Sequence, residues 1–265
     1  LLIVHGSTVA TNAVLEKKGV RCCFITNEGM ADMLTIGRQA RKELYHLNPA
    51  VESPPVPPAL CLQTAGRVSA KGELLSPLTD EQLTALHAQV EKLAPQSVAI
   101  NLLFSFLNDE AEKRIEAAMP AGVFVSRSSK VLPEYKEYER GMATWLNAYV
   151  GPLVSGYLGK LTQSLSSSSV SVMQSSGGTI AAEQAGEQAV RMLLSGPAGG
   201  LVAALHIGKT AGFDRLLTLD MGGTSTDVAL LDGAISLTNE GKVAGYPVAV
   251  PMVDMHTIGA GGGSI

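Results

Sequence analysis

The sequence predicts an α/β protein, and three observations support that class. Short apolar runs rich in β-branched residues alternate with stretches whose apolar residues recur every three or four positions, as in layered α/β folds. Glycines and Asn/Asp/Glu clusters separate these runs and supply turns and helix ends. The chain has 265 residues, 46% of them hydrophobic, so it can bury a core and matches about two domains of ~150 residues.

The first half of the chain predicts repeated strand and helix units. Residues 1–4 predict a strand that leads through a polar turn into a short helix, which Gly19 ends. A second strand follows at residues 20–26. Helical spacing then covers residues 30–47, and prolines between 49 and 58 predict an extended segment.

The next units have clear helix starts. Thr79, Asp80 and Glu81 are typical of a helix N-terminus, and this helix should run to Leu93. Residues 97–106 predict a strand. The sequence at residues 108–110 predicts the start of a further helix, which runs to residue 119 and leads to a short strand at 123–126.

The second half begins with a long amphipathic helix. From Tyr135 to Leu161 apolar residues recur at i, i+3, i+4 and i+7, with Trp145 in the core stripe and a bend expected at Pro152. A serine-rich loop, a strand at 170–174 and a turn at residues 177–178 follow.

The last seventy residues differ from the rest. Strands at 216–220, 226–231 and 234–238, joined by glycine turns, predict an antiparallel meander. We therefore expect a domain boundary near Gly196, between residues 1–195 and 196–265.

Composition excludes several function classes. The formal net charge is −4 with no basic block, which argues against a nucleic-acid or membrane-surface partner. No apolar run reaches the ~20 residues of a bilayer span. Cys22 and Cys23 are adjacent and Cys61 is distant, so they predict buried inert thiols in the cytoplasm rather than a disulfide framework or a four-ligand metal set.

The strongest chemical signal is a glycine hairpin in residues 217–231. Asp220 ends one apolar strand, Gly222 and Gly223 make the turn, and Thr224 and Thr226 lead into the next strand. Backbone N–H groups of such glycines can approach an anion, and hydroxyls add donors. The hairpin lacks the lysine of a P-loop. It predicts a phosphate site with a divalent cation on Asp220.

This hairpin, Asp-x-Gly-Gly-Thr-x-x-Asp, resembles a phosphate motif of the actin, heat-shock-chaperone and sugar-kinase ATPase superfamily. Residues 196–205 resemble the small-residue interdomain helix that precedes it there. Six segments in order are similar to the A subunit of the hydantoinase/oxoprolinase family. They are residues 5–13, 36–39, 134–140, 195–200, 220–227 and 254–264.

The resemblance implies actin-like (ribonuclease H-like) ATPase lobes, one nearly complete and the second truncated. Residues 1–195 would form the first lobe without its N-terminal phosphate hairpin, and 196–265 the hinge helix and the start of the second. It implies ATP-dependent ring opening of a hydantoin or 5-oxoproline, with ATP, Mg²⁺ and a B-type partner subunit in an oligomeric full-length protein. We expect the chain to be a fragment that does not turn over ATP alone.

The resemblance also assigns roles within the glycine clusters. Asp220 would hold Mg²⁺ or its bound water, and the hairpin glycines and hydroxyls would hold phosphate oxygens. Asp227 is expected to brace the turn, because a second carboxylate facing phosphate would repel it. The cofactor-binding loop would comprise Gly261, Gly262 and Gly263. Asp254 and His256 would then reach a metal or substrate, or form a structural pair.

Other candidates lie elsewhere in the chain. A strand-to-helix junction carries His5, Ser7, Thr8, Thr11 and Asn12, which suit either an anion site or a helix cap. The arginines at 38 and 41 suit either a site that binds a carboxylate or carboxy-phosphate, or an exposed helix face in solvent. We take Arg38 as a substrate-binding candidate. Charged residues at 134–140 predict a helix start with local i, i+3 pairs. They are Glu134, Glu137, Glu139 and Arg140.

Three other functions remain open at the level of sequence. An ATP-dependent carboxylase subunit of the same family, a small-molecule kinase and an ATP-gated interaction module all use a similar phosphate hairpin. The residues leave the ring substrate and the metal open.

Overall fold

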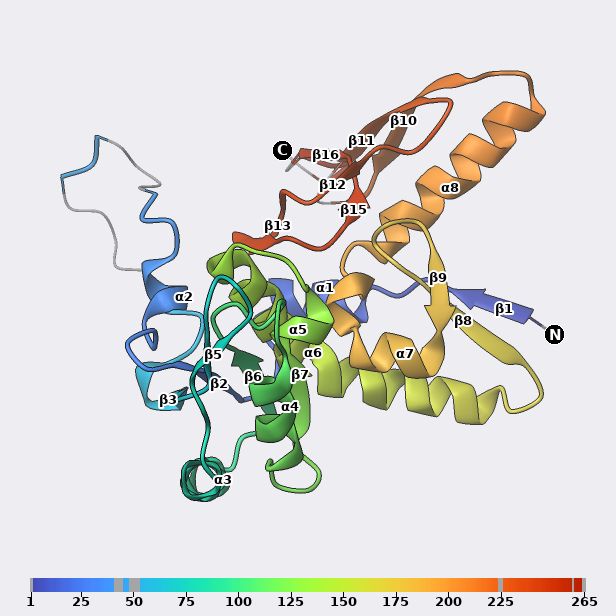
Figure 1. Cartoon of the computed structure of the whole chain (residues 1–265). Helices are drawn as coiled ribbons and strands as arrows, with labels where there is room; N and C mark the ends of the chain where they lie inside the picture. Colours follow the sequence, from blue (N-terminus) through green and yellow to red (C-terminus); the bar gives the residue numbers. More distant parts are fainter. Residues whose placement is uncertain (1, 41–44, 48–52, 224–225, 259, 264–265) are drawn as a thin grey trace. The chain divides into compact units, whose positions relative to one another are not determined.

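A computed structural model describes residues 2–40, 45–47, 53–223, 226–258 and 260–263 (Figure 1). It has a mixed α/β fold, so the predicted class is confirmed. The chain forms two compact units. Unit 1 comprises Leu1–Lys17, Leu153–Gly245 and Val250–Ile265, and unit 2 comprises Lys18–Pro152 and Tyr246–Ala249. The predicted boundary near Gly196 lies inside unit 1 and stays a prediction.

Unit 2 is built on a parallel four-stranded sheet. Its order is β3 (Cys61–Thr64), β2 (Cys22–Asn27), β6 (Ser97–Asn101) and β7 (Phe124–Arg127). Every residue of β2 and β6 is buried, as is typical of central parallel strands covered on both faces. The strand predicted at 97–106 ends early, because residues 103–107 turn and Phe104 has a φ of 56°.

The helices of unit 2 follow their sequence signals to different degrees. Thr79 caps α3 (Asp80–Leu93) in a capping box with Gln82, as the sequence indicated. Among the described residues of the predicted helical stretch 30–47, the spacing gives α2 (Met33–Ile36), which ends at Gly37 with a φ of 55°. The remaining elements are η1 (Pro58–Leu60), β4 (Arg67–Val68), β5 (Leu74–Ser76), α4 (Glu110–Ala117), α5 (Ser128–Val131) and β14 (Tyr246–Val248).

The long helix α6 (Glu137–Ser164) has residues in both units, and the division falls at Pro152 within it. Its predicted core stripe is confirmed in unit 2, where Trp145 is 3% exposed. The Trp145 ring stacks on Tyr149 and meets the edge of Tyr246. None of the helices in the described part of the chain is long and apolar enough to cross a bilayer.

Unit 1 contains two three-stranded sheets. In the first, β1 (Leu2–His5) pairs in parallel with β8 (Ser169–Met173), and β9 (Thr179–Ala181) joins β8 antiparallel. The second is antiparallel and has the order β10 (Arg215–Met221), β11 (Thr226–Asp232) and β16 (His256–Ile258).

The predicted third strand at 234–238 is present only as a short strand, and it does not pair with β11 as a meander would require. β12 (Leu237–Thr238) pairs with β15 (Met252–Val253), and β16 takes the expected place beside β11. After β11 the chain turns at Gly233, which has a φ of 69° and whose N–H donates to Asp214 O, so the chain leaves the sheet edge.

Helices complete unit 1. α1 (Val9–Leu15) ends before Gly19, the residue that was expected to end it. α8 (Ser195–Thr210) packs on the second sheet through a core formed by Ala198 and Leu201 with Ala229 and Val253. The remaining elements are α7 (Ala182–Glu187), η2 (Ala189–Met192) and β13 (Gly241–Val243).

Candidate functional site

The six sequence segments meet in pairs. In unit 1, residues 5–13 contact 195–200, and residues 220–227 contact 254–264. In unit 2, residues 36–39 contact 134–140. Segments that are distant in sequence therefore form three local sites.

The glycine hairpin lies at one end of β10 and β11. Asp220 and Asp227 are directly opposite each other in the antiparallel register, and Asp220 is exposed. A cavity of about 270 Å³ lies beside them, with α8 on one side and residues 218–220 and 227–229 on the other. Asp220 and Asp227 are both among the residues that line this cavity. The arrangement leaves Asp220 accessible to a ligand.

Asp227 has a different environment from Asp220. The Thr257 hydroxyl of β16 donates to Asp227 Oδ1 at 2.7 Å. Thr257 is also the register partner of Asp227, so this bond ties β16 to the hairpin. The geometry agrees with a bracing role for Asp227, which stays a prediction.

The glycine-rich loop at 260–263 is bonded to the hairpin. Gly262 N donates to Gly222 O and Gly263 N donates to Gly223 O, each at 2.9 Å. The Thr226 hydroxyl, on a residue that is 5% exposed, donates to Ala260 O at 2.6 Å. The sequence predicted that these groups hold a cofactor directly. In this structure the two loop amides bond the hairpin, and the Thr226 hydroxyl of the hairpin bonds the loop.

The two catalytic candidates near this loop are both exposed. Asp254 follows β15, and its backbone N–H donates to Ser236 O at 2.8 Å. His256 lies in β16 opposite Val228. Met255, which lies between them in sequence, lines the cavity beside Asp220, whereas Asp254 and His256 do not. Their catalytic role stays a prediction.

Some predicted residues lie outside the described part of the chain. Thr224 of the hairpin is one, and Arg41 is another.

The strand-to-helix junction at residues 5–12 is bonded within unit 1. Thr11 Oγ1 accepts from Leu194 N, and the Ser195 hydroxyl donates to Ser7 O, each at 3.0 Å. Asn12 Nδ2 donates to Thr8 Oγ1 at 3.4 Å. Thr8 makes no side-chain cap bond to α1. These hydroxyls therefore dock the junction on the start of α8.

His5 is the remaining candidate of this junction. Its Nε2 lies 2.8 Å from the Tyr157 hydroxyl, and the two rings are tilted at 38°. Tyr157 lies on the part of α6 that belongs to unit 1. The imidazole thus has a specific partner that the sequence did not indicate.

In unit 2, Arg38 forms a two-bond pair with Glu139. Nε lies 2.8 Å from Oε1 and Nη2 lies 2.5 Å from Oε2. The hydrogen bond to Glu139 raises the pKa of Arg38. Burial raises the pKa of Glu139, but hydrogen bonds and the charges of Arg38 and Lys136 outweigh it, so the net shift is downward.

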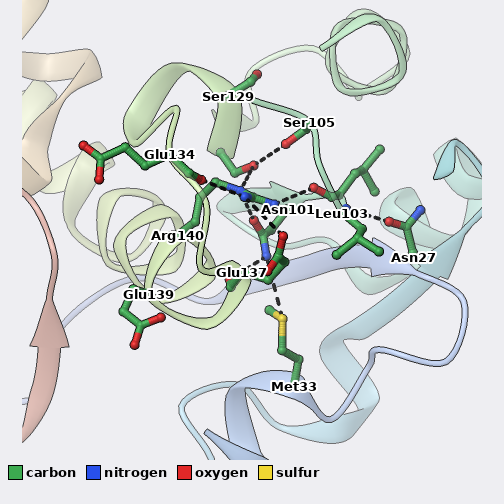
Figure 2. A network of polar contacts seen from close by, with 12 residues as sticks. Asn27, Met33, Asn101, Leu103, Ser105, Ser129, Glu134, Glu137, Glu139 and Arg140 are labelled. Carbon is green, nitrogen blue, oxygen red and sulfur yellow. Dashed lines mark hydrogen bonds and ion pairs between the residues drawn. The ribbon is translucent and has the colours of Figure 1, made fainter. Parts of the chain in front are cut away.

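Arg140 is completely buried, which corrects the expectation of a purely local charged helix start. The predicted i, i+3 pair exists, with Arg140 Nη1 3.7 Å from Glu137 Oε1. The guanidinium also donates to Asn101 Oδ1 and to the Leu102 and Glu134 carbonyls (Figure 2). Burial lowers the pKa of Arg140, and the carboxylates of Glu137 and Glu112 oppose that shift.

A buried carboxylate completes this network. Glu112 is fully buried and accepts from the Ser128 hydroxyl and from Leu102 N. Ser128 Oγ also lies 3.1 Å from Arg140 Nε, so it connects the two charges. Sequence reasoning missed Glu112, Ser128 and Asn101. The available signal was a polar residue ending an apolar strand at Asn101.

The cysteines are reduced thiols. Burial raises the pKa of Cys22 to about 12 and that of Cys23 to about 11, and it also raises the pKa of Cys61. Thiols in such surroundings are poor nucleophiles.

Two family models match the chain. Hydantoinase/oxoprolinase N-terminal region matches residues 1–121, and hydantoinase/oxoprolinase matches residues 140–265. The chain belongs to the hydantoinase/oxoprolinase family.

Relatives in this family carry several activities in their names. The chain is 35% identical to caprolactamase subunit alpha of Pseudomonas jessenii, over 100% of this chain and 39% of that protein. It is 33% identical to 5-oxoprolinase 1 of Arabidopsis thaliana, over 98% of this chain and 22% of that protein. The chain therefore spans between a fifth and two fifths of the length of these relatives.

Solved structures of the family show the same fold. The crystal structure of ATP-dependent caprolactamase from Pseudomonas jessenii superposes with a TM-score of 0.85 and 32% identity, over 99% of this chain and 39% of that chain. A nucleotide-free structure of acetone carboxylase gives 0.83 and 29% identity, over 97% and 39%. This agreement confirms the fold class.

The hairpin of this family member is open around Asp220 and Gly223. Asp220 is exposed, and a Cβ placed on Gly223 would meet no atom within 4 Å. Among the described residues, no three His, Cys, Asp or Glu side chains gather into a metal set. Mg²⁺ suits a site with one protein carboxylate, because phosphate oxygens and water supply its other ligands. The residues present thus fit the phosphates of MgATP.

Proposed function

We propose that the full-length protein opens a cyclic amide of the hydantoin or 5-oxoproline type in an ATP-dependent reaction. The observation that carries this proposal is the placement of Asp220. Asp220 is exposed at the end of β10, lines a cavity, and lies beside a glycine turn in which a Cβ on Gly223 would meet no atom within 4 Å. Membership of the hydantoinase/oxoprolinase family supports the substrate class.

The chemistry explains why ATP is needed. A ring amide is stabilised by resonance, and bound ATP supplies the phosphoryl group that activates its carbonyl oxygen. Asp220 would hold the Mg²⁺ ion that neutralises the phosphates. The backbone N–H of Gly223 would donate to a phosphate oxygen. Water attack would then need residues outside this chain, and we propose that a B-type partner subunit in a cytoplasmic oligomer supplies them.

The names of relatives support this reading. Caprolactamase and 5-oxoprolinase both denote action on a cyclic amide. Caprolactamase subunit alpha is also named as one subunit of a larger enzyme, which supports the proposed partner.

A second candidate is an ATP-dependent carboxylase subunit. The acetone carboxylase beta subunit of Xanthobacter autotrophicus is 31% identical over 98% of this chain and 39% of that protein. This similarity supports a hairpin that binds ATP in the same way, with a different substrate accepting the phosphoryl group.

Phosphate release by the full-length protein tests the proposal. Hydantoin, 5-oxoproline or caprolactam should stimulate release, and acetone with bicarbonate should not. Asp220→Asn should lower stimulated release by about a hundredfold or more, since it removes the proposed metal ligand. Asp214→Asn, an exposed aspartate before the other end of β10, is the matched control and should keep wild-type rates.

Three results would count against it. Wild-type turnover by Asp220→Asn would remove Asp220 from the reaction. Stimulation by acetone and bicarbonate alone would favour the carboxylase. Labelled phosphate that ends on a stable product rather than in solution would indicate a kinase.

A further inference from the structure

The loop at residues 260–263 has a specific geometric relation to the hairpin turn. Successive carbonyls of an extended strand point to opposite sides. Here the consecutive Gly222 and Gly223 carbonyls both accept bonds from the same segment, through the amides of Gly262 and Gly263. The hairpin backbone is therefore curled at this point, and the 260–263 loop holds it in that form.

The curl fixes the direction of an amide. No described peptide bond is cis. In a trans peptide the C=O of one residue and the N–H of the next point in opposite directions. Because Gly222 O points at Gly262 N, the N–H of Gly223 points away from the 260–263 loop. A Cβ on Gly223 would meet nothing within 4 Å, so the hairpin turn is not crowded there.

Further contacts hold the loop beside the hairpin. Thr226, buried in β11, donates its hydroxyl to Ala260 O at 2.6 Å. Immediately before the loop, Thr257 of β16 bonds Asp227 at 2.7 Å. Hydrogen bonds to both the backbone and the side chains of the hairpin thus hold the loop in place.

We propose that Gly262 and Gly263 are positioning residues that direct the Gly223 N–H at a bound phosphate, an inference that rests on the proposed function. They do not touch the phosphate. Their amides bond the Gly222 and Gly223 carbonyls. The Gly223 N–H, which points the opposite way, is then free to donate a hydrogen bond to the phosphate. This role differs from the cofactor contact that the sequence predicted for these glycines.

The two glycines differ in a way that permits a matched test. A Cβ at position 263 would lie 2.9 Å from Gly223 O, closer than real Cβ atoms approach. A Cβ at position 262 would lie 3.8 Å from Gly222 O, an ordinary contact. Neither glycine has a φ in the left-handed region, so alanine is allowed by the backbone at both. Gly263→Ala should therefore separate the loop from the hairpin, and Gly262→Ala should not.

The experiment measures MgATP binding and amide hydrogen exchange in the full-length protein. Gly263→Ala should weaken MgATP binding roughly tenfold, the loss expected for about one backbone hydrogen bond. The control Gly156→Ala, on α6 with open space around an added Cβ, should stay within about twofold of wild type. Without nucleotide, the amides of residues 262 and 263 should exchange slowly in wild type and fast in Gly263→Ala. In wild type, MgATP should add protection at the Gly223 amide, a readout that needs no variant.

The outcomes separate the two proposals. A wild-type protein that binds MgATP but gains no protection at Gly223 overturns the positioning role alone. So does a Gly263→Ala variant that loses protection at 262 and 263 yet binds MgATP as wild type does. A wild-type protein that binds no MgATP overturns the proposed function and the positioning role with it.

Discussion

Glu139 holds Arg38 by both of its carboxylate oxygens, across 101 residues of sequence. Oε1 accepts from Nε at 2.8 Å and Oε2 from Nη2 at 2.5 Å, in the planar fork that only arginine presents. Beside this pair, a Cβ on Gly37 would lie 3.2 Å from the Tyr138 hydroxyl. The pair connects the segment after α2 to the first turn of α6 within unit 2.

We expect this pair to stabilise unit 2 modestly. A double-mutant cycle with Arg38→Met and Glu139→Gln should give a coupling free energy of about 0.5–1 kcal/mol, because the Arg38 side chain is 56% exposed. Urea unfolding at neutral pH is the measurement. Arg38→Lys keeps the charge but loses the fork and should lose part of the coupling. A coupling near zero would mean that solvent screens the pair.

The same pair predicts a pH dependence. The pKa of Glu139 is lower in the folded chain than in the unfolded chain, so its contribution is present above the ordinary glutamate pKa of about 4.3. It is lost as the pH falls through the folded pKa, below that value. Unfolding free energies measured from pH 6 down to pH 3 should therefore fall more for wild type than for Glu139→Gln. Parallel plots of unfolding free energy against pH for the two proteins would contradict a lowered Glu139 pKa in the folded chain.

Arg140 should be far more sensitive than Arg38. Arg140→Met leaves the buried Glu112 carboxylate without its nearby cation and three acceptors without a donor, so unfolding free energy should fall by about 3–5 kcal/mol. Lys160→Met removes an exposed cation from the same helix and should change stability by less than about 0.5 kcal/mol. Equal effects in urea unfolding would show that burial of Arg140 is unimportant.

Glycines within α6 should respond oppositely to alanine. A Cβ at Gly151 would overlap the ring of Phe124, so Gly151→Ala should destabilise the protein by about 1–3 kcal/mol. Gly156 has open space, and Gly156→Ala should stabilise it by up to about 1 kcal/mol through helix propensity. Thermal unfolding of the two variants measures the difference. A shift of the same sign in both would contradict the packing at Gly151.

The cysteines should resist thiol reagents in the folded protein. Because the pKa values of Cys22 and Cys23 are about 12 and 11, neither thiol should react with a disulfide reagent at pH 8 until the chain unfolds. The raised pKa values also imply that their contribution to stability is complete below the unfolded thiol pKa of about 8.5 and declines as the pH rises above it. Counting reactive thiols before and after adding urea checks the first point. Rapid reaction of Cys22 in native protein would contradict its burial.

Local signals in the sequence were sufficient for much of the fold. The cap at Thr79 and the stripe around Trp145 each depend on contacts within one helix or one face, and both are confirmed. Arg140 could not be placed, because charged residues at a helix start look the same whether solvent or a buried carboxylate neutralises them. Its partner Glu112 lies on α4, far away in sequence.

The candidate site was predictable in part. The hairpin register of Asp220 with Asp227 follows from two apolar strands and a glycine turn. The second partner strand of β11 was not predictable, since strands as short as β12 and β16 differ little in their pattern of apolar and polar residues. The bonds from Gly262 and Gly263 to the hairpin depend on that pairing, so the sequence indicated a ligand loop without showing what the loop holds.

The parallel pairing of β1 with β8 places a constraint on synthesis. Leu2 lies opposite Ser169, and the whole of the first segment of unit 2 is translated between them. At roughly 5–20 residues per second, a ribosome needs on the order of ten seconds or more to deliver the partner strand. During that time β1 lacks its β8 partner, while the first segment of unit 2 is being made. The first sheet of unit 1 can therefore form only after the first segment of unit 2 has left the ribosome.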